Sequence, residues 1–305
     1  MASESELIPR RAMRLTTTAS LCLAILKLGA GIYTGSVAVM ASAVDSFFDF
    51  LVSGFNAFAV RSTEKPRDEF YNYGRGKMEG IAATSEGLFI LGSAAFIARQ
   101  AILKLLHPQT ISTLQLDLAA GAMFLSILAA LGITLYLQRA SRNTRSLVVK
   151  ADSLHYRTDI FSNGAILIAM VLIRFTGWQM ADPLLGLGIA VYIAKESLPL
   201  IRQGLDVLLD RALPEKLVEQ IRDIATTHST RISGAHELKT RRSGDMNFVE
   251  LHLVFDEDIS LGAAHHVADE IEMRIRALEK SKWSVNIHLD PVDDSHRDQR
   301  LTEMP

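Results

Sequence analysis

The 305-residue chain has few of the features that define several common protein classes. Its one cysteine, Cys22, excludes a disulfide framework and any metal site built on several thiolates. With 32 Lys and Arg against 34 Asp and Glu, it lacks the basic excess of a nucleic-acid-binding protein. It has no GxxxxGK[ST] loop, so a nucleotide partner and ATP-driven pumping are not expected. An apolar share of 49% excludes a disordered chain.

Long stretches without charge indicate a membrane protein. Residues 118–138 carry no charged side chain, and about 20 apolar residues suffice to cross a bilayer core. A soluble helical bundle is the alternative, but it would carry charge along every helix, which this segment does not. We predict six membrane-spanning helices, at residues 14–34, 37–61, 80–105, 117–138, 148–175 and 182–208.

The distribution of positive charge predicts the orientation of these spans. Lys and Arg gather before the first span, after the second, after the fourth and after the sixth: Arg10, Arg11, Arg14, Arg61, Lys65, Arg67, Arg75, Lys77, Arg139, Arg142, Arg145, Lys150, Arg202 and Arg211. Loops rich in Lys and Arg stay in the cytoplasm. We therefore predict a cytoplasmic segment at 1–13, a transmembrane domain at 14–208 and both termini in the cytoplasm. No cleavage site follows the first apolar stretch, so we expect this span to be retained.

The last third of the chain changes character and predicts a small α+β domain. Pro214 is expected to begin a helix, and 261–278 has the apolar spacing of a second one. Residues 247–255 alternate between apolar and polar, and 283–289 form a further strand. The predicted fold class is a membrane α-helical protein with six transmembrane helices, followed by a cytoplasmic αββαβ, ferredoxin-like domain at 212–290. A flexible tail is expected at 291–305.

Four ionisable residues inside the predicted spans indicate a cation site. Asp45 and Asp49 are four residues apart in the second span, and His155 and Asp159 are four apart in the fifth. Each pair shares one helical face, although a charge in the bilayer costs about 3 kcal/mol. Oxygen and imidazole ligands suit zinc and also accept Fe²⁺, Mn²⁺ or Cd²⁺. The same groups bind protons, so metal and protons would compete.

Two other interpretations of these residues remain open. The pairs could be hydrogen-bonded contacts that hold helices together. They could also be the catalytic groups of a membrane protease or a zinc hydrolase. A protease would usually have one aspartate on each of two helices, and a catalytic zinc keeps a position open for water.

Four motifs carry a family resemblance: VDSFFD at 44–49, YGRGKME at 73–79, ADSLHYRTD at 151–159 and LLDRALPE at 208–215. With them, the sequence resembles the cation diffusion facilitator family, and in particular its bacterial zinc and ferrous-iron efflux transporters. The resemblance implies a homodimer in the bacterial inner membrane that exchanges cytoplasmic metal for external protons by alternating access. Zinc is the expected substrate, with Fe(II) and Cd(II) next. Such a protein is a secondary transporter and not an enzyme.

The resemblance also implies roles for single residues. Asp45, Asp49, His155 and Asp159 correspond to the transport site. His155 is the expected proton carrier, because the ordinary pKa of histidine, about 6.5, lies in the physiological range. Lys77 and Asp210 correspond to a salt bridge that ties the dimer near a hinge, and Leu154 to a hydrophobic gate.

The loop between the second and third spans departs from the family pattern. Close relatives carry an aspartate and two histidines there, which bind a further ion. Asp68 remains, but Tyr71 and Arg75 stand where the histidines would be. Tyrosine is a poor zinc ligand and arginine is none, so we predict a weak or missing site.

A second metal site is predicted in the cytoplasmic domain. Its proposed ligands match the family's regulatory site: His236, His252, His265, His288 and Asp290. His288 and Asp290 are two apart on a strand and so point the same way. We expect this site to bind Zn²⁺ between protomers and to tighten the dimer. A membrane-bound metal-dependent hydrolase and a metal sensor without flux are the alternative classes.

Overall fold

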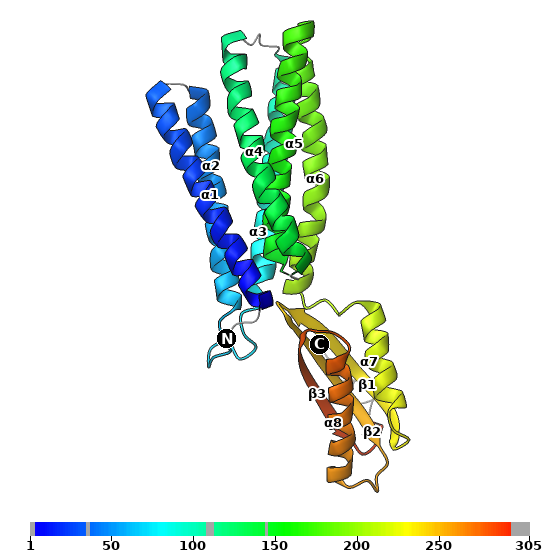
Figure 1. The fold of residues 1–305 in the computed structure, drawn as a ribbon. Helices are drawn as coiled ribbons and strands as arrows, with labels where there is room; N and C mark the ends of the chain where they lie inside the picture. Colours follow the sequence, from blue (N-terminus) through cyan, green and yellow to red (C-terminus); the bar gives the residue numbers. More distant parts are fainter. Residues whose placement is uncertain (1–3, 35–36, 108–112, 144–145, 294–305) are drawn as a thin grey trace. The chain divides into compact units, whose positions relative to one another are not determined.

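The computed structural model describes residues 4–34, 37–107, 113–143 and 146–293. The chain divides between Leu205 and Asp206 into two compact units, which are described separately. The first unit is helical, and the second combines helices with a sheet (Figure 1).

The first unit consists of six long helices that alternate in direction (Figure 1). They are α1 (Glu4–Thr34), α2 (Val37–Thr63), α3 (Met78–Leu106), α4 (Thr113–Asn143), α5 (Leu147–Thr176) and α6 (Ala181–Leu208). Each is longer than the roughly 20 residues that a bilayer core requires. The six predicted spans each lie within one of these helices.

The six helices differ in how apolar they are. Among the described residues, α3, α5 and α6 are long and apolar enough to cross a membrane, and α4 contributes the shorter apolar stretch Ile127–Ser141. Large apolar side chains of α2 point outward, among them Phe47, Phe55 and Phe58. Small or branched side chains such as Ala59 and Val148 fill the interior. An apolar exterior around a closely packed interior is the arrangement expected of helices in lipid.

Helices α3 and α6 approach closely at Gly204. A Cβ atom at this position would lie 2.2 Å from Thr84 Oγ1 and 2.8 Å from the carbonyl oxygen of Gly80. We expect Gly204→Ala to lower the free energy of unfolding by about 1–3 kcal/mol, because the backbone of α3 must move. Thermal unfolding in detergent would measure this. Gly188→Ala on the same helix is the control, since no described atom lies within 4 Å of its added Cβ. Equal melting temperatures for the two variants would contradict the prediction.

The second unit has the predicted αββαβ order. Its elements are α7 (Glu215–Thr227), β1 (Ile232–Ser243), β2 (Met246–Phe255), α8 (Leu261–Ala277) and β3 (Lys282–Asp290). The strand order is β1-β2-β3, with β1 and β2 antiparallel and β2 and β3 parallel. The α-helical membrane class with a following α+β domain is confirmed. Most of the predicted tail, 294–305, lies outside the described residues.

One face of this sheet forms the core. Val249, Leu251 and Leu253 of β2 are buried against apolar residues of both helices, including Ile221 of α7 and Ile271 of α8. The alternation of β2 therefore leaves its other face for polar residues, His252 among them. Ser260 caps α8, where its Oγ accepts a hydrogen bond from the Ala263 N–H at 3.2 Å.

Strand β1 contains an irregularity beside this polar face. Glu237 has a positive φ of 50°, and the pairing register with β2 shifts between His236 and Lys239. Such a bulge re-aims the neighbouring side chain. His236 remains the register partner of His252.

Candidate metal sites

The first group of possible metal ligands joins α2 and α5. His155 Nε2 lies 3.1 Å from Asp49 Oδ1 and 3.7 Å from Asp159 Oδ2. One atom from each of the three residues lies within 4.8 Å of the other two. His155 is only 4% exposed, and the rings of Phe89 and Tyr156 lie beside it. The structure thus brings together three of the four predicted transport ligands. The side chain of the fourth, Asp45, lies outside the described residues, although its backbone continues α2 one turn before Asp49.

Leu154, which precedes His155 in the chain, borders a cavity. It is partly buried against residues of α3 and α6. The cavity has a volume of about 440 Å³ and is also lined by Lys150, Arg157, Glu196 and Gln203. The predicted gate function of Leu154 stays a prediction.

An ion pair between α5 and α6 was not predicted. Arg157 donates one hydrogen bond to Glu196 and a second one, of 2.9 Å, to the hydroxyl of Tyr192. Both charged residues lie inside predicted spans. That placement is a sequence signal for a partner on another helix, because charges in a span are paired.

The 64–77 loop contains a neutralised carboxylate. Asp68 Oδ2 accepts a hydrogen bond from Arg75 at 2.5 Å, and its Oδ1 accepts from the N–H groups of Phe70 and Tyr71. Loss of water around the carboxyl acts to raise the pKa of Asp68, but the bonds from Arg75 and Tyr71 outweigh it and lower this pKa. The Arg75 guanidinium also stacks over the Tyr71 ring at 4.2 Å. A cationic side chain therefore lies against the carboxylate that a metal would need.

We expect Asp68→Asn to leave the number of metal ions bound per chain unchanged. Both Asp68 oxygens already have donors, and a guanidinium repels a divalent ion. Equilibrium dialysis of the purified protein with zinc would measure the stoichiometry, with Asp49→Asn as the variant that should lower it. A lower stoichiometry for Asp68→Asn would mean that the loop does bind metal.

The predicted Lys77–Asp210 salt bridge joins the two separately described units and stays a prediction. Lys77 is the N-cap residue of α3 in the first unit. Asp210, in the second unit, has a positive φ of 55° and lies 3.4 Å from Arg241.

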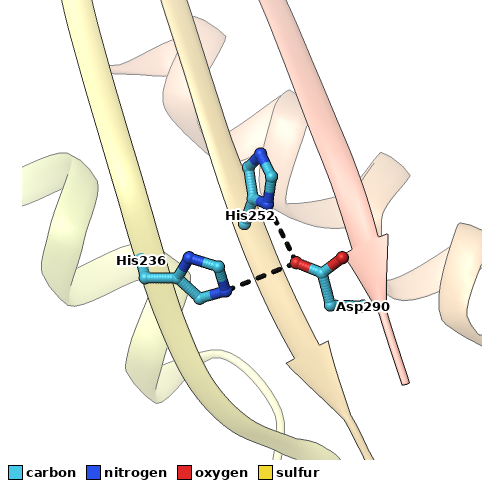
Figure 2. A group of neighbouring side chains, drawn as sticks. All are labelled: His236, His252 and Asp290. Atoms are coloured by element: carbon cyan, nitrogen blue, oxygen red, sulfur yellow. Dashed lines mark hydrogen bonds and ion pairs between the residues drawn. The ribbon is translucent and has the colours of Figure 1, made fainter. Parts of the chain in front are cut away.

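The second group of possible ligands lies on the sheet of the second unit (Figure 2). Asp290 Oδ2 lies 2.9 Å from His252 Nδ1 and 3.4 Å from His236 Nε2. His288 Nε2 lies 3.2 Å from the other oxygen, Oδ1. The Asp290 side chain is 8% exposed. Because His236 pairs with His252 and His252 with His288, the three imidazoles form a row across β1, β2 and β3.

Four of the five predicted cytoplasmic ligands are therefore together, and His265 is not among them. Its side chain is 70% exposed on α8 and lies 3.6 Å from Asp269.

Glu237 lies next to His236, one end of the imidazole row, in the sequence. The hydrogen bond from Lys239 lowers the pKa of Glu237, and the charges of Lys239, His252 and His236 act in the same direction.

The donor set of the sheet group fits a transition metal. Imidazole nitrogens with one carboxylate oxygen are typical zinc ligands. Three side chains converge from three strands, and the structure fixes their backbone by ladder pairing.

A bundle of long apolar helices with an imidazole–carboxylate group, followed by a sheet domain with a second such group, is the arrangement expected of a membrane transporter for metal ions. The profile of the cation efflux transmembrane domain matches residues 13–209, and that of the cation efflux protein cytoplasmic domain matches 213–292. The chain belongs to the cation efflux family, the cation diffusion facilitators. It is a multi-pass membrane protein that exports divalent metal cations, and members of this family are transporters and not enzymes.

Relatives that match almost the whole chain agree with this assignment. Cation-efflux pump FieF of Salmonella newport (strain SL254) is 37% identical over 299 residues, which cover 98% of this chain and 97% of that protein. FieF of Salmonella typhimurium matches to the same extent. A solved structure of CzrB is 34% identical and covers 26% of this chain and 98% of its own, with a TM-score of 0.25.

Proposed function

We propose that this protein is a proton-coupled antiporter that exports zinc from the cytoplasm. The observation that supports this most directly is the contact of buried His155 with both Asp49 and Asp159. These residues belong to two different helices, so relative motion of α2 and α5 would open or close the group.

The chemistry of the group favours zinc. Imidazole nitrogen with carboxylate oxygen suits Zn²⁺, and Fe²⁺ and Cd²⁺ also accept such ligands. Thiolates would hold these ions more tightly and release them less readily. Asp45 is the proposed fourth ligand, since it lies one helical turn from Asp49.

The same contacts provide the exchange. His155 must lose its proton before its nitrogen can bind a metal, and carboxylates must be ionised. Protons from outside would bind His155 and its carboxylates and displace the metal. The metal and the protons thus occupy one site in alternation.

The sheet group is the proposed regulatory site, with Zn²⁺ as its ligand. Asp290 and its histidines would hold the ion, and exposed His265 on α8 is available to a second copy of the chain. Metal binding between protomers would tighten a homodimer. If binding left both protomer spacing and transport rate unchanged, this part of the proposal would be wrong.

The proposed location is the bacterial inner membrane, with both termini in the cytoplasm. The Lys and Arg residues of the 64–77 loop support this orientation, because such loops remain cytoplasmic.

Flux in proteoliposomes tests the proposal. An imposed pH gradient should drive zinc movement, and a change of internal pH should accompany it. Competition by Fe(II), Cd(II) and Co(II) would rank the substrates. Zinc flux that does not respond to the pH gradient would contradict proton coupling, and stronger transport of another ion would contradict zinc as the main substrate.

A further inference from the structure

A second polar group lies inside the helical bundle, and none of its members is a proposed metal ligand. It consists of Asn56 on α2, Glu86 on α3 and Asp152 on α5. Asn56 and Asp152 are 0% exposed and Glu86 is 2% exposed. Two carboxyl groups this deeply buried need a specific explanation, because ionised groups in a bilayer core are costly.

The hydrogen bonds of the group are incomplete. Asn56 Nδ2 donates to Glu86 Oε2 at 2.9 Å. Four other acceptor oxygens have no hydrogen-bond partner among the described residues: Glu86 Oε1, Asn56 Oδ1, Asp152 Oδ1 and Asp152 Oδ2. All four are buried, and buried acceptors are normally paired.

The donors that neighbour Asp152 also contact other groups. Thr16, Asn56 and Ser53 are the side-chain donors that face Asp152. Their geometry is too poor for a regular hydrogen bond to either of its oxygens. The Thr16 hydroxyl donates to the carbonyl oxygen of Met13, and the Ser53 hydroxyl lies 3.5 Å from the Tyr156 hydroxyl. These side chains can therefore serve Asp152 only in part, and Glu86 Oε1 has no donor among the described residues.

A proton fits this group better than a metal ion. The donor atoms are oxygens only, from three side chains, whereas zinc favours nitrogen or sulfur ligands and a hard cation needs about six oxygens. A proton on a carboxyl group turns one acceptor oxygen into a donor. One proton can thus satisfy the oxygen that carries it and a facing acceptor at once.

The group lies about one helical turn from the transport site along α5. Asp152 precedes His155 by three residues, about 4.5 Å along the axis of α5. Asn56 follows Asp49 by two helical turns on α2. Compared with the transport ligands, Asn56 and Asp152 therefore both lie closer to the end of the bundle that carries the 64–77 loop (Figure 1).

The charged groups around the two carboxyls come from several helices. Glu86 interacts electrostatically with Asp152, His155 and Asp159 of α5, and Asp152 interacts with His155. From α2 the facing groups are Asn56 and Ser53, and from α1 Thr16. The cations Lys150 and Arg157 of α5 contact Gln203 and Glu196 of α6 instead.

We propose that Glu86 and Asp152 form a proton-binding site that is separate from the metal ligands and takes part in each exchange cycle. The site binds a proton, with formation of one carboxyl O–H bond, when the metal leaves. It releases that proton to the cytoplasm when the positive charge of the next metal arrives near His155. This inference rests on the proposed proton coupling and adds a second place where protons are held.

Proton counting tests the site directly. Zinc flux and internal pH would be recorded together in proteoliposomes that hold wild type, Glu86→Gln or Asp152→Asn. We expect each variant to lower the number of protons moved per zinc ion by up to about one, with zinc affinity at equilibrium changed less than threefold. Asp182→Asn is the control, since Asp182 pairs with Lys104 outside this group.

The outcomes separate the two proposals. If wild type moves zinc without protons, the proposed antiport itself is wrong. If wild type couples the two and both variants keep the wild-type ratio, only this inference is wrong, and a buried water would be the missing donor. If the variants do not fold, infrared spectroscopy of zinc-free wild type decides. Absence of any protonated carboxyl band would overturn the site, and a band that remains in zinc-free Asp49→Asn would support it.

Discussion

Replacing His155 by alanine should lower zinc flux by at least about 100-fold. Loss of a residue that only orients a metal ligand weakens metal binding or activity by up to about 100-fold, and loss of a ligand itself should cost at least as much. His155 is the one residue of its group that contacts both Asp49 and Asp159. Its removal takes away the nitrogen ligand and leaves two carboxylates that repel each other. Initial zinc uptake into proteoliposomes under a fixed pH gradient measures the loss.

A second histidine provides the matched control. His228 is also nearly buried and lies 2.7 Å from a carboxylate, Glu270 Oε2, but in the second unit. His228→Gln should retain most of the flux. If His155→Ala retained flux within a few-fold of wild type, the group on α2 and α5 could not be the transport site.

Replacing Asp290 by alanine should weaken metal binding at the sheet by about 100-fold or more. Loss of a residue that only orients a ligand already weakens metal binding by up to about 100-fold, and Asp290 is a proposed ligand itself. This carboxylate contacts His236, His252 and His288, so its removal takes one ligand and releases the orientation of three others. Isothermal titration of the full-length protein with zinc should then lose one class of sites, while the sites of the first unit remain.

Acidification should weaken this binding in wild type as well, because an imidazole must give up its proton to bind a metal. Asp256→Ala is the control variant, since Asp256 is an exposed residue just after β2. An unchanged titration for Asp290→Ala would remove the sheet group as a metal site.

Much of the fold could be predicted because it follows from periodicity. Uninterrupted apolar stretches predicted the helices of the bundle, and the alternation of residues 247–255 predicted β2 with its buried face. The bulge at Glu237 could not be predicted, because a positive φ in a glutamate has no sequence signature. It arises from the pairing of β1 with β2, which is a contact across strands.

The candidate sites divide in the same way. The four-residue spacing of Asp45 and Asp49, and that of His155 and Asp159, predicted the transport site, because both members of each pair lie on one helix. Glu86 and Asp152 were not predicted, because the interaction between them runs from α3 to α5 and depends on how these helices pack. His265 was grouped with the other histidines by family pattern, but its position on α8 directs it away from the row within one chain.

The order of the strands has a consequence for how the sheet group is assembled during synthesis. β1 and β2 are neighbours in sequence and can pair as a local hairpin, whereas β3 must reach β2 through α8. Local contacts form faster than distant ones, and the amino-terminal part of a chain leaves the ribosome first. Asp290 is the last residue of the last strand, so its carboxylate should join the histidines only when the whole domain has emerged. A nascent chain would present a hairpin with two imidazoles but without the carboxylate of Asp290, and would therefore capture metal weakly until its fold is complete.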